Sequence, residues 1–280
     1  MLKLTTVILA VHILIIGMIP ADTCQASEII RINGSGNALD MMKPLIAAYI
    51  KTNRNIRIEM EKPLGSTGAT KALLTGALDL AVTSRNIKPE ETTKGARQLK
   101  YGKTPVVIVT EKNVHKSGIS TKELEDIFTG KKIYWENGEK IRLVLRPNED
   151  IDTNILRALS DGINKAIDAA HARPGMIMAI TDPESYSTIA KTPGSIGTTS
   201  LNSIIGEKLP LNILPFNGIK PSLKAISNGS YPLAKEINFV TTTKTTPETK
   251  RLINYIFSPQ GRAIAEKAGV LVTASPTEGK

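Results

Sequence analysis

The pattern of apolar and polar positions after residue 27 alternates between short strands and longer helices. A short apolar strand at 28–33 is followed by apolar positions at helical spacing from Leu39 to Ile50. Further strands are expected at 56–60 and 78–83. Alternation of strand and helix is typical of an α/β protein. We therefore expect an α/β fold, long enough at 280 residues for two packed lobes.

Proline and glycine positions predict where several helices begin and end. We expect Pro44 early in the first helix, where a missing N–H costs least. A short helix is expected from Ala69 to Gly76, ended by that glycine. Towards the C-terminus, 247–257 and 259–268 are predicted to be two helices, each with an early proline.

Each of the first three strands ends in a polar loop. The loops are Gly34-Ser35-Gly36-Asn37, Gly65-Ser66-Thr67-Gly68 and Thr83-Ser84-Arg85-Asn86. Because ligands of an open α/β sheet bind beyond the carboxyl ends of its strands, we expect the loops to face one crevice. The second loop opens onto a helix, whose free N–H groups and dipole suit an anion. An ordinary capped helix is the alternative for one loop, but the recurrence favours an oxyanion site.

The second loop differs from a nucleotide-binding P-loop. That motif, G-x-x-x-x-G-K-[ST], requires a glycine where Thr70 stands and a hydroxyl residue where Ala72 stands. We therefore exclude this class of nucleotide site.

The amino terminus predicts export. Lys3 precedes an apolar run at 7–19 that is too short to span a bilayer, and small residues at Cys24 and Ala26 favour cleavage after Ala26. A lipid anchor on Cys24 is the alternative, but Asp22-Thr23 precedes it where small or apolar residues are required. Cleavage would leave a chain without cysteine and without a membrane-spanning segment, and so a soluble exported protein.

Composition narrows the functional classes. The net charge of +10 would suit nucleic acid, a membrane surface or the attraction of small anions. Aromatic residues are only 4% and are not interleaved with runs of Lys and Arg, which argues against nucleic-acid binding. His115 and His171 lie far apart without cysteine, so we expect no metal centre and no cofactor. No G-x-S-x-G motif or nucleophile–base pair supports an enzyme.

Two longer motifs extend these loops. The pattern GSG-x-A is present at 34–38, and GS-x-G-x-x-K-A-L-L-x-G-x-x-D-x-A-V-x-S-R at 65–85. Further matching segments are TPVVIV at 104–109, LEDIFTGKK at 124–132, RLVLRP at 142–147 and TPGSIG at 192–197. In these segments the sequence resembles the phosphate-binding proteins of ABC importers, which are periplasmic binding proteins of type 2. The resemblance covers nearly the whole chain after residue 26 and is looser after about residue 200.

The resemblance implies two α/β lobes, each a mixed sheet flanked by helices, joined by two crossing segments and closing on ligand by hinge motion. We expect the signal peptide at 1–26, the first lobe at 27–108 and 236–280, and the second lobe at 109–235. The implied function is capture of phosphate or a related oxyanion in the periplasm and its delivery to an ABC permease. We expect the protein to act as a monomer.

The resemblance also implies the ligand contacts. They are expected from Ser35, Gly36, Asn37, Ala38, Ser66, Thr67, Gly68, Ser84, Arg85, Arg146, Asp152 and Thr153. Some members of the family have an aspartate where this chain has Ser84, and the guanidinium of Arg146 matches the family arginine that suits a tetrahedral oxyanion.

The sequence departs from the family after this arginine. Phosphate binders usually continue with Ser-Gly-Thr, whereas 148–154 is NEDIDTN, in which only Thr153 matches. A like charge at about 4 Å costs on the order of 4 kcal/mol at an effective dielectric of about 20, against about 8 kcal/mol for micromolar binding. The three carboxylates therefore cannot all face a phosphate dianion.

Three alternatives remain for these carboxylates. Asp150 or Asp152 caps the helix that begins near Thr153, or one of them accepts a hydrogen bond from a protonated ligand, or one neutralises Arg146 and phosphate binding is lost. In the last case the protein would be a periplasmic sensor or interaction domain with a non-phosphate ligand or none.

Overall fold

The structure is a computed structural model that describes residues 28–274. Its strands are β1 (Glu28–Gly34), β2 (Ile56–Met60), β3 (Leu80–Thr83), β4 (Arg97–Glu111), β5 (Arg142–Leu145), β6 (Ile177–Met178), β7 (Ser195–Ser200), β8 (Leu211–Leu214), β9 (Ala234–Thr241) and β10 (Leu271–Val272). Its helices are α1 (Gly36–Thr52), α2 (Gly65–Leu74), α3 (Pro89–Thr93), α4 (Thr121–Thr129), α5 (Ile151–Arg157), α6 (Asp161–Ala172), α7 (Asp182–Lys191), α8 (Leu201–Glu207), α9 (Leu223–Ser227), α10 (Pro247–Phe257) and α11 (Pro259–Lys267). Helices and strands alternate, which confirms the predicted α/β fold.

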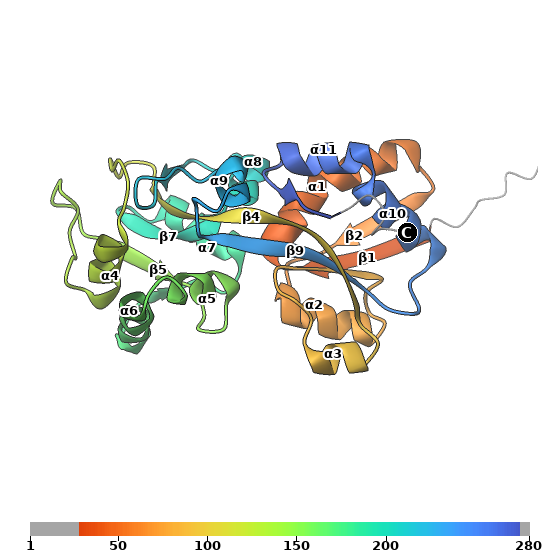
Figure 1. Cartoon of the computed structure of the whole chain (residues 1–280), viewed down its shortest axis with the longest axis horizontal. Coiled ribbons are helices and arrows are strands. Elements are labelled where there is room, and N and C mark those ends of the chain that lie inside the picture. Colours follow the sequence, from red (N-terminus) through yellow and green to blue (C-terminus); the bar gives the residue numbers. More distant parts are fainter. Residues whose placement is uncertain (1–27, 275–280) are drawn as a thin grey trace, which may run out of the picture.

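The strands form one mixed sheet with two parallel groups. Its order is β2-β1-β3-β9-β4-β7-β5-β6, and β8 and β10 both pair with β4. β1 is parallel to β2 and β3, while β5 is parallel to β6 and β7. Between the two groups, β4 and β9 run antiparallel, side by side (Figure 1). Each parallel group presents the carboxyl ends of its strands at one edge, where ligand-binding loops are expected.

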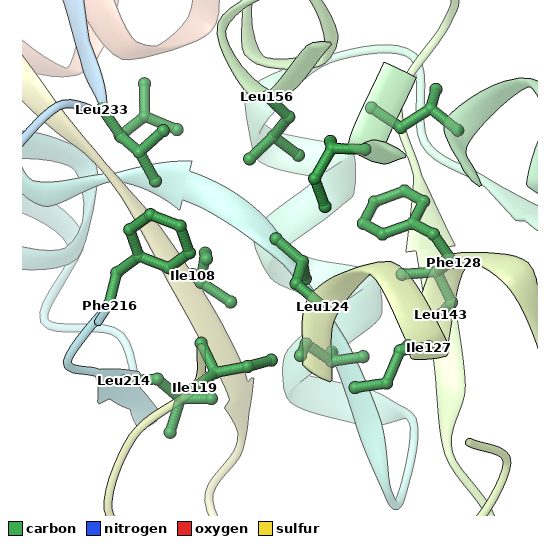
Figure 2. Close-up of a cluster of buried hydrophobic side chains, with 14 of the residues drawn as sticks. Ile108, Ile119, Leu124, Ile127, Phe128, Leu143, Leu156, Leu214, Phe216 and Leu233 are labelled. Carbon is green, nitrogen blue, oxygen red and sulfur yellow. The ribbon is translucent and has the colours of Figure 1, made fainter. Parts of the chain in front are cut away.

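Two large hydrophobic cores divide the molecule. We call residues 28–101 and 237–274 the first half. Side chains from these two segments, from Ile30 to Tyr101 and from Ile237 onward, pack into one core. The second half is 106–233, whose core contains side chains from β4, α4, β5 and β8 that face one another in Figure 2. β4 and β9 run through both halves of the molecule, as Figure 1 shows.

The two C-terminal helices confirm the sequence prediction. α10 and α11 each have a proline in the first turn, where an N–H has no partner within the helix. The hydroxyls of Thr246 and Ser258 cap them by accepting hydrogen bonds from the N–H groups of Thr249 and Gly261, both at 3.2 Å.

Two helix boundaries were predicted wrongly. α1 begins at Gly36, so Pro44 lies in its interior, where it removes the N–H that would bond the carbonyl of Asp40. Burial of Met41, Met42 and Leu45 offsets that loss. α2 begins at Gly65 rather than Ala69, because the glycine-rich loop itself takes helical conformation.

The predicted signal peptide lies outside the described residues. Among residues 28–274, no helix combines the length and the apolar character that crossing a bilayer would require.

Candidate functional site

A cleft of about 230 Å³ lies where the two halves meet. Its walls are the loops that follow β1, β2 and β3 in the first half and the loops that follow β5 and β6 in the second. Lys235, on β9, also lines it. The cleft therefore forms at the carboxyl ends of both parallel groups.

Hydrogen bonds link the three polar loops of the first half. The hydroxyls of Ser35 and Ser84 lie 2.7 Å apart, and Ser84 Oγ donates to Asn37 Oδ1 at 2.8 Å. The backbone N–H of Ser84 donates to Ser66 Oγ at 3.0 Å. The structure thus brings together four residues from three loops that lie far apart in the sequence, all of them lining the cleft.

Two helices open onto this wall without a side-chain cap. The side chains of Ser35, the N-cap of α1, and Leu64, the N-cap of α2, accept no hydrogen bond from the N–H groups of their helices. By contrast, Ser120 and Ser160 cap α4 and α6. The N–H groups in the first turns of α1 and α2 are therefore available to an anion in the cleft, except that of Asn37, which donates to Asp182 Oδ2.

The opposite wall carries Arg146, which directly follows β5. This guanidinium is 6% exposed, donates to Asp150 Oδ2 at 2.6 Å and also donates to the carbonyl of Ala179 at 3.2 Å. Its Nε has no partner among the described residues. Burial alone would lower the pKa of Arg146, but the charges of Asp182, Asp150 and Asp152 raise it, so the group stays cationic.

Asp150 both caps α5 and pairs with Arg146, contacts that belong to two of the three alternatives left open by the sequence. The loss of phosphate binding that the second of these included stays a hypothesis. Asp150 is the N-cap of α5, where its Oδ1 accepts the N–H of Asp152 at 2.9 Å. Its other oxygen neutralises Arg146. Burial and the negative charge of Asp152 raise the pKa of Asp150 despite the nearby arginine, which makes it a carboxylate that gains a proton readily as pH falls.

A buried lysine pairs with two carboxylates in the cleft. This lysine, Lys235, was not among the site residues expected from the sequence. Lys235 Nζ lies 2.8 Å from Asp152 Oδ1 and 2.7 Å from Asp182 Oδ1, and all three side chains are at most 6% exposed. Burial would lower the pKa of Lys235, but Asp152 and Asp182 raise it above its ordinary value. Burial would raise the pKa of Asp182, but Lys235 and Arg146 lower it to about 2.

Asp182 also contacts the first half. Its Oδ2 accepts the backbone N–H of Asn37, in the first turn of α1, at 3.2 Å. A carboxylate of the chain therefore occupies one of the donors that an anion would use. Residues 181–184, Thr-Asp-Pro-Glu, have the pattern of a capping box, which accounts for the start of α7. Because a capping box explains these residues without a ligand, the sequence alone gave no reason to place Asp182 in the site.

Arg85 lines the cleft, but its two terminal nitrogens are already paired. They donate to Glu91 at 2.8 and 2.6 Å, and Nη2 also lies 3.3 Å from Thr67 Oγ1. Arg85 therefore shapes the wall beside Thr67 in this conformation.

Three of the expected residues do not line the cleft. Ala38 is fully buried in the first core, and Gly68 lies one step deeper in α2 than Thr67. The hydroxyl of Thr153 donates to the backbone carbonyl of Arg146 at 3.3 Å and faces a separate apolar cavity, because α5 begins two residues before it. The side chains of Ala38 and Thr153 therefore serve packing in this conformation.

The cleft has more carboxylates than cations. Glu149, Asp150, Asp152 and Asp182 face Arg85, Arg146 and Lys235 along its lining. Residues 28–274 contain no group of three or more His, Cys, Asp or Glu side chains arranged to hold a metal ion. The site is therefore a polar binding cleft with paired charges.

Sequence comparison identifies relatives over most of the chain. The profile of the PBP superfamily domain, PBP_like_2, matches residues 21–260. The phosphate-binding protein PstS of Borreliella burgdorferi is 26% identical over 254 residues, which is 87% of this chain and 90% of that protein. The phosphate-binding protein PstS of Bacillus subtilis is 32% identical over 147 residues, or 50% of this chain and 45% of that protein.

Structural comparison identifies the same fold. A putative phosphate ABC transporter substrate-binding protein from Clostridium perfringens, solved with bound phosphate, superposes with a TM-score of 0.74 at 18% identity, covering 88% of this chain and 100% of that one. The high-affinity periplasmic phosphate-binding protein PfluDING, solved with phosphate, gives 0.66 at 13% identity, covering 90% and 92%. The predicted type 2 periplasmic-binding-protein fold is confirmed.

Proposed function

The chain belongs to the PBP superfamily, and on that premise we propose that it is an exported solute-binding protein. Its cleft captures phosphate or a related oxyanion, and the loaded protein delivers that anion to the permease of an ABC importer. The names of its relatives, several of which are phosphate-binding proteins, support a binding rather than a catalytic role.

One observation carries the proposal. Two helix starts without a side-chain cap, those of α1 and α2, open onto the same cleft as the buried guanidinium of Arg146. Ser35, Ser66 and Ser84, which are linked by hydrogen bonds, line the same cleft. Charge-assisted hydrogen bonds of about 1.5–3 kcal/mol each are sufficient for micromolar affinity after the costs of ordering.

The proposal includes the domain division and the export signal. The lobes are residues 27–108 with 236–280, and 109–235, and the change of core along β4 and β9 supports hinge motion there. Cleavage after Ala26 releases the protein into the periplasm. N-terminal sequencing of the exported protein tests the cleavage site, because it should begin at Ser27.

Oxyanion-dependent thermal stabilisation of the mature protein tests the function. Phosphate and related anions should raise the melting temperature, and Arg146→Ala should abolish that shift. Arg142→Ala, which changes the exposed first residue of the strand that Arg146 follows, is the matched control. Because Arg146 is buried, Ser66→Ala provides a second variant, expected to reduce the shift while the protein stays folded. An unchanged shift in both variants would contradict the proposal.

A second candidate function rests on the internal charge pairs. Lys235 is already neutralised by Asp152 and Asp182, and Arg146 by Asp150. A sensor or interaction domain that keeps the fold without an oxyanion ligand would fit this balance. Such a protein would show no melting shift with any oxyanion and would bind an envelope protein instead of a permease.

A further inference from the structure

Among residues 28–274, four buried polar atoms that belong to cleft-lining side chains have no hydrogen-bond partner. One of them, Nε of Arg85, is on a side chain that is 14% exposed, and the other three lie deeper. These three are Nδ2 of Asn37, Nε of Arg146 and Oδ2 of Asp152, on side chains that are at most 6% exposed. Two of these atoms are donors and the third is an acceptor. Because buried polar atoms are nearly always paired, they indicate a ligand with both acceptors and a donor.

The charges along the cleft also favour a ligand that carries a positively charged donor group. Every cation of the lining already has a carboxylate partner from the chain. Glu149, exposed at the rim, makes no ion pair within the described residues, and Asp152 keeps one oxygen free. An anion alone would add negative charge to a lining that already has a surplus, whereas an added ammonium group would reduce it.

The size and the apolar rim of the cleft indicate that a short hydrocarbon linker joins the anionic and the cationic group of the ligand. A volume of about 230 Å³ holds more than a single tetrahedral anion, since a water molecule needs about 10–15 Å³ by the same measure. Leu64 and Ile180, at the ends of the facing loops, line the cleft although they are 53% and 66% exposed. A short hydrocarbon linker would bury part of this apolar surface.

We propose that the ligand is a zwitterion in which a short alkyl chain joins a phosphoryl or phosphonyl group to a primary ammonium. The oxyanion lies at the first turns of α1 and α2 near Nε of Arg146, and the ammonium faces Oδ2 of Asp152 and the carboxylate of Glu149. This assignment rests on the proposed oxyanion capture and names the chemical class of its ligand.

Three probes separate the charge requirement from the oxyanion requirement. Isothermal titration of the mature protein with 2-aminoethylphosphonate should give a dissociation constant at least tenfold lower than titration with ethylphosphonate, which has the same linker without the ammonium. Inorganic phosphate should also bind at least tenfold more weakly than 2-aminoethylphosphonate, which we call the amine. Equal or tighter binding of ethylphosphonate or phosphate would overturn the zwitterion assignment and leave oxyanion capture standing. If none of the three probes binds, both proposals fail.

Two isosteric variants locate the ammonium. Asp152→Asn and Glu149→Gln should each lower the ratio of affinities for the two phosphonates at least threefold, through weaker binding of the amine. Glu149→Gln is the informative variant if Asp152→Asn destabilises the fold, because Glu149 is exposed at the rim. Glu59→Gln, on β2 and away from the cleft lining, is the control and should leave the ratio unchanged. A full preference for the amine in both cleft variants would refute the placement.

Discussion

The carboxylate of Asp182 accepts the backbone N–H of Asn37 at 3.2 Å, although 145 positions separate the two residues. Asn37 lies in the first turn of α1, in the first half, and Asp182 is the first residue of α7, in the second half. The contact therefore joins the two walls of the cleft at a helix N-terminus, where negative charge is stabilised. An incoming oxyanion has to share these donors with Asp182 or displace it.

The lowered pKa of Asp182 predicts a loss of stability in acid. Because its folded pKa of about 2 lies below the ordinary 3.8, ionised Asp182 contributes stability above about pH 4 and loses it as pH falls towards 2. The contribution is on the order of 2 kcal/mol, since one pKa unit corresponds to about 1.4 kcal/mol. Urea unfolding should show a smaller drop between pH 4 and 2 for Asp182→Asn than for the unaltered protein. Asp161→Asn, in the first turn of α6, is the control, and parallel pH curves for all three proteins would contradict this role.

Lys235 is predicted to be essential for stability. Lys235→Met would leave Asp152 and Asp182 buried without their cation, so the free energy of unfolding should fall by about 3–5 kcal/mol in urea. The triple variant Lys235→Met, Asp152→Asn, Asp182→Asn should recover more than half of that loss, because no buried charge of the triad remains.

Lys100→Met, an exposed lysine on β4, is the matched control for Lys235 and should change the free energy of unfolding by less than about 0.5 kcal/mol. Failure of the triple variant to recover stability would show that Lys235 contributes through packing rather than charge.

The first wall of the cleft was predictable because it uses local chemistry. The glycine and hydroxyl residues of each loop directly follow an apolar strand, and parallel strands bring such loops to one edge. Ser35, Ser66 and Ser84 meet there as expected. The family pattern also led to Arg146, because it directly follows a buried strand.

The ion pairs of Lys235 in the cleft could not be predicted, because they join residues far apart in the sequence. Lys235 lies 83 and 53 positions from Asp152 and Asp182, and neither spacing has a local signature. Lys235 alternates with the apolar Ile237 and Phe239 on one face of β9, and this position was the available signal that a buried carboxylate lies opposite. Asp150 was expected among the capping candidates, but its simultaneous bond to Arg146 depends on how α5 packs beside β5.

Arg85 is predicted to act on stability together with Glu91. The bidentate pair is mostly buried, with side chains 14% and 12% exposed. Arg85→Gln and Glu91→Gln should each lower the free energy of unfolding by about 1–3 kcal/mol, and the double variant should cost little more than either one. A double-mutant cycle in urea measures this coupling. Strict additivity of the two losses would show that the ion pair contributes nothing and that Arg85 is free for other contacts.

Gly36→Ala is predicted to impair closure of the cleft while leaving each core intact. A Cβ at Gly36 would lie 2.5 Å from Pro183 Cδ and 2.9 Å from Asp182 Cβ, so the start of α1 could not approach α7 as closely. The clash lies at the contact between the halves, outside both cores. We therefore expect a larger radius of gyration by small-angle X-ray scattering and at least tenfold weaker oxyanion binding. Gly206→Ala, on the facing helix α8, is the control, because the nearest atom to its Cβ would be the carbonyl oxygen of Asp40 at 3.8 Å. A radius and an affinity that match this control would show that α1 and α7 do not need to meet for the ligand to bind.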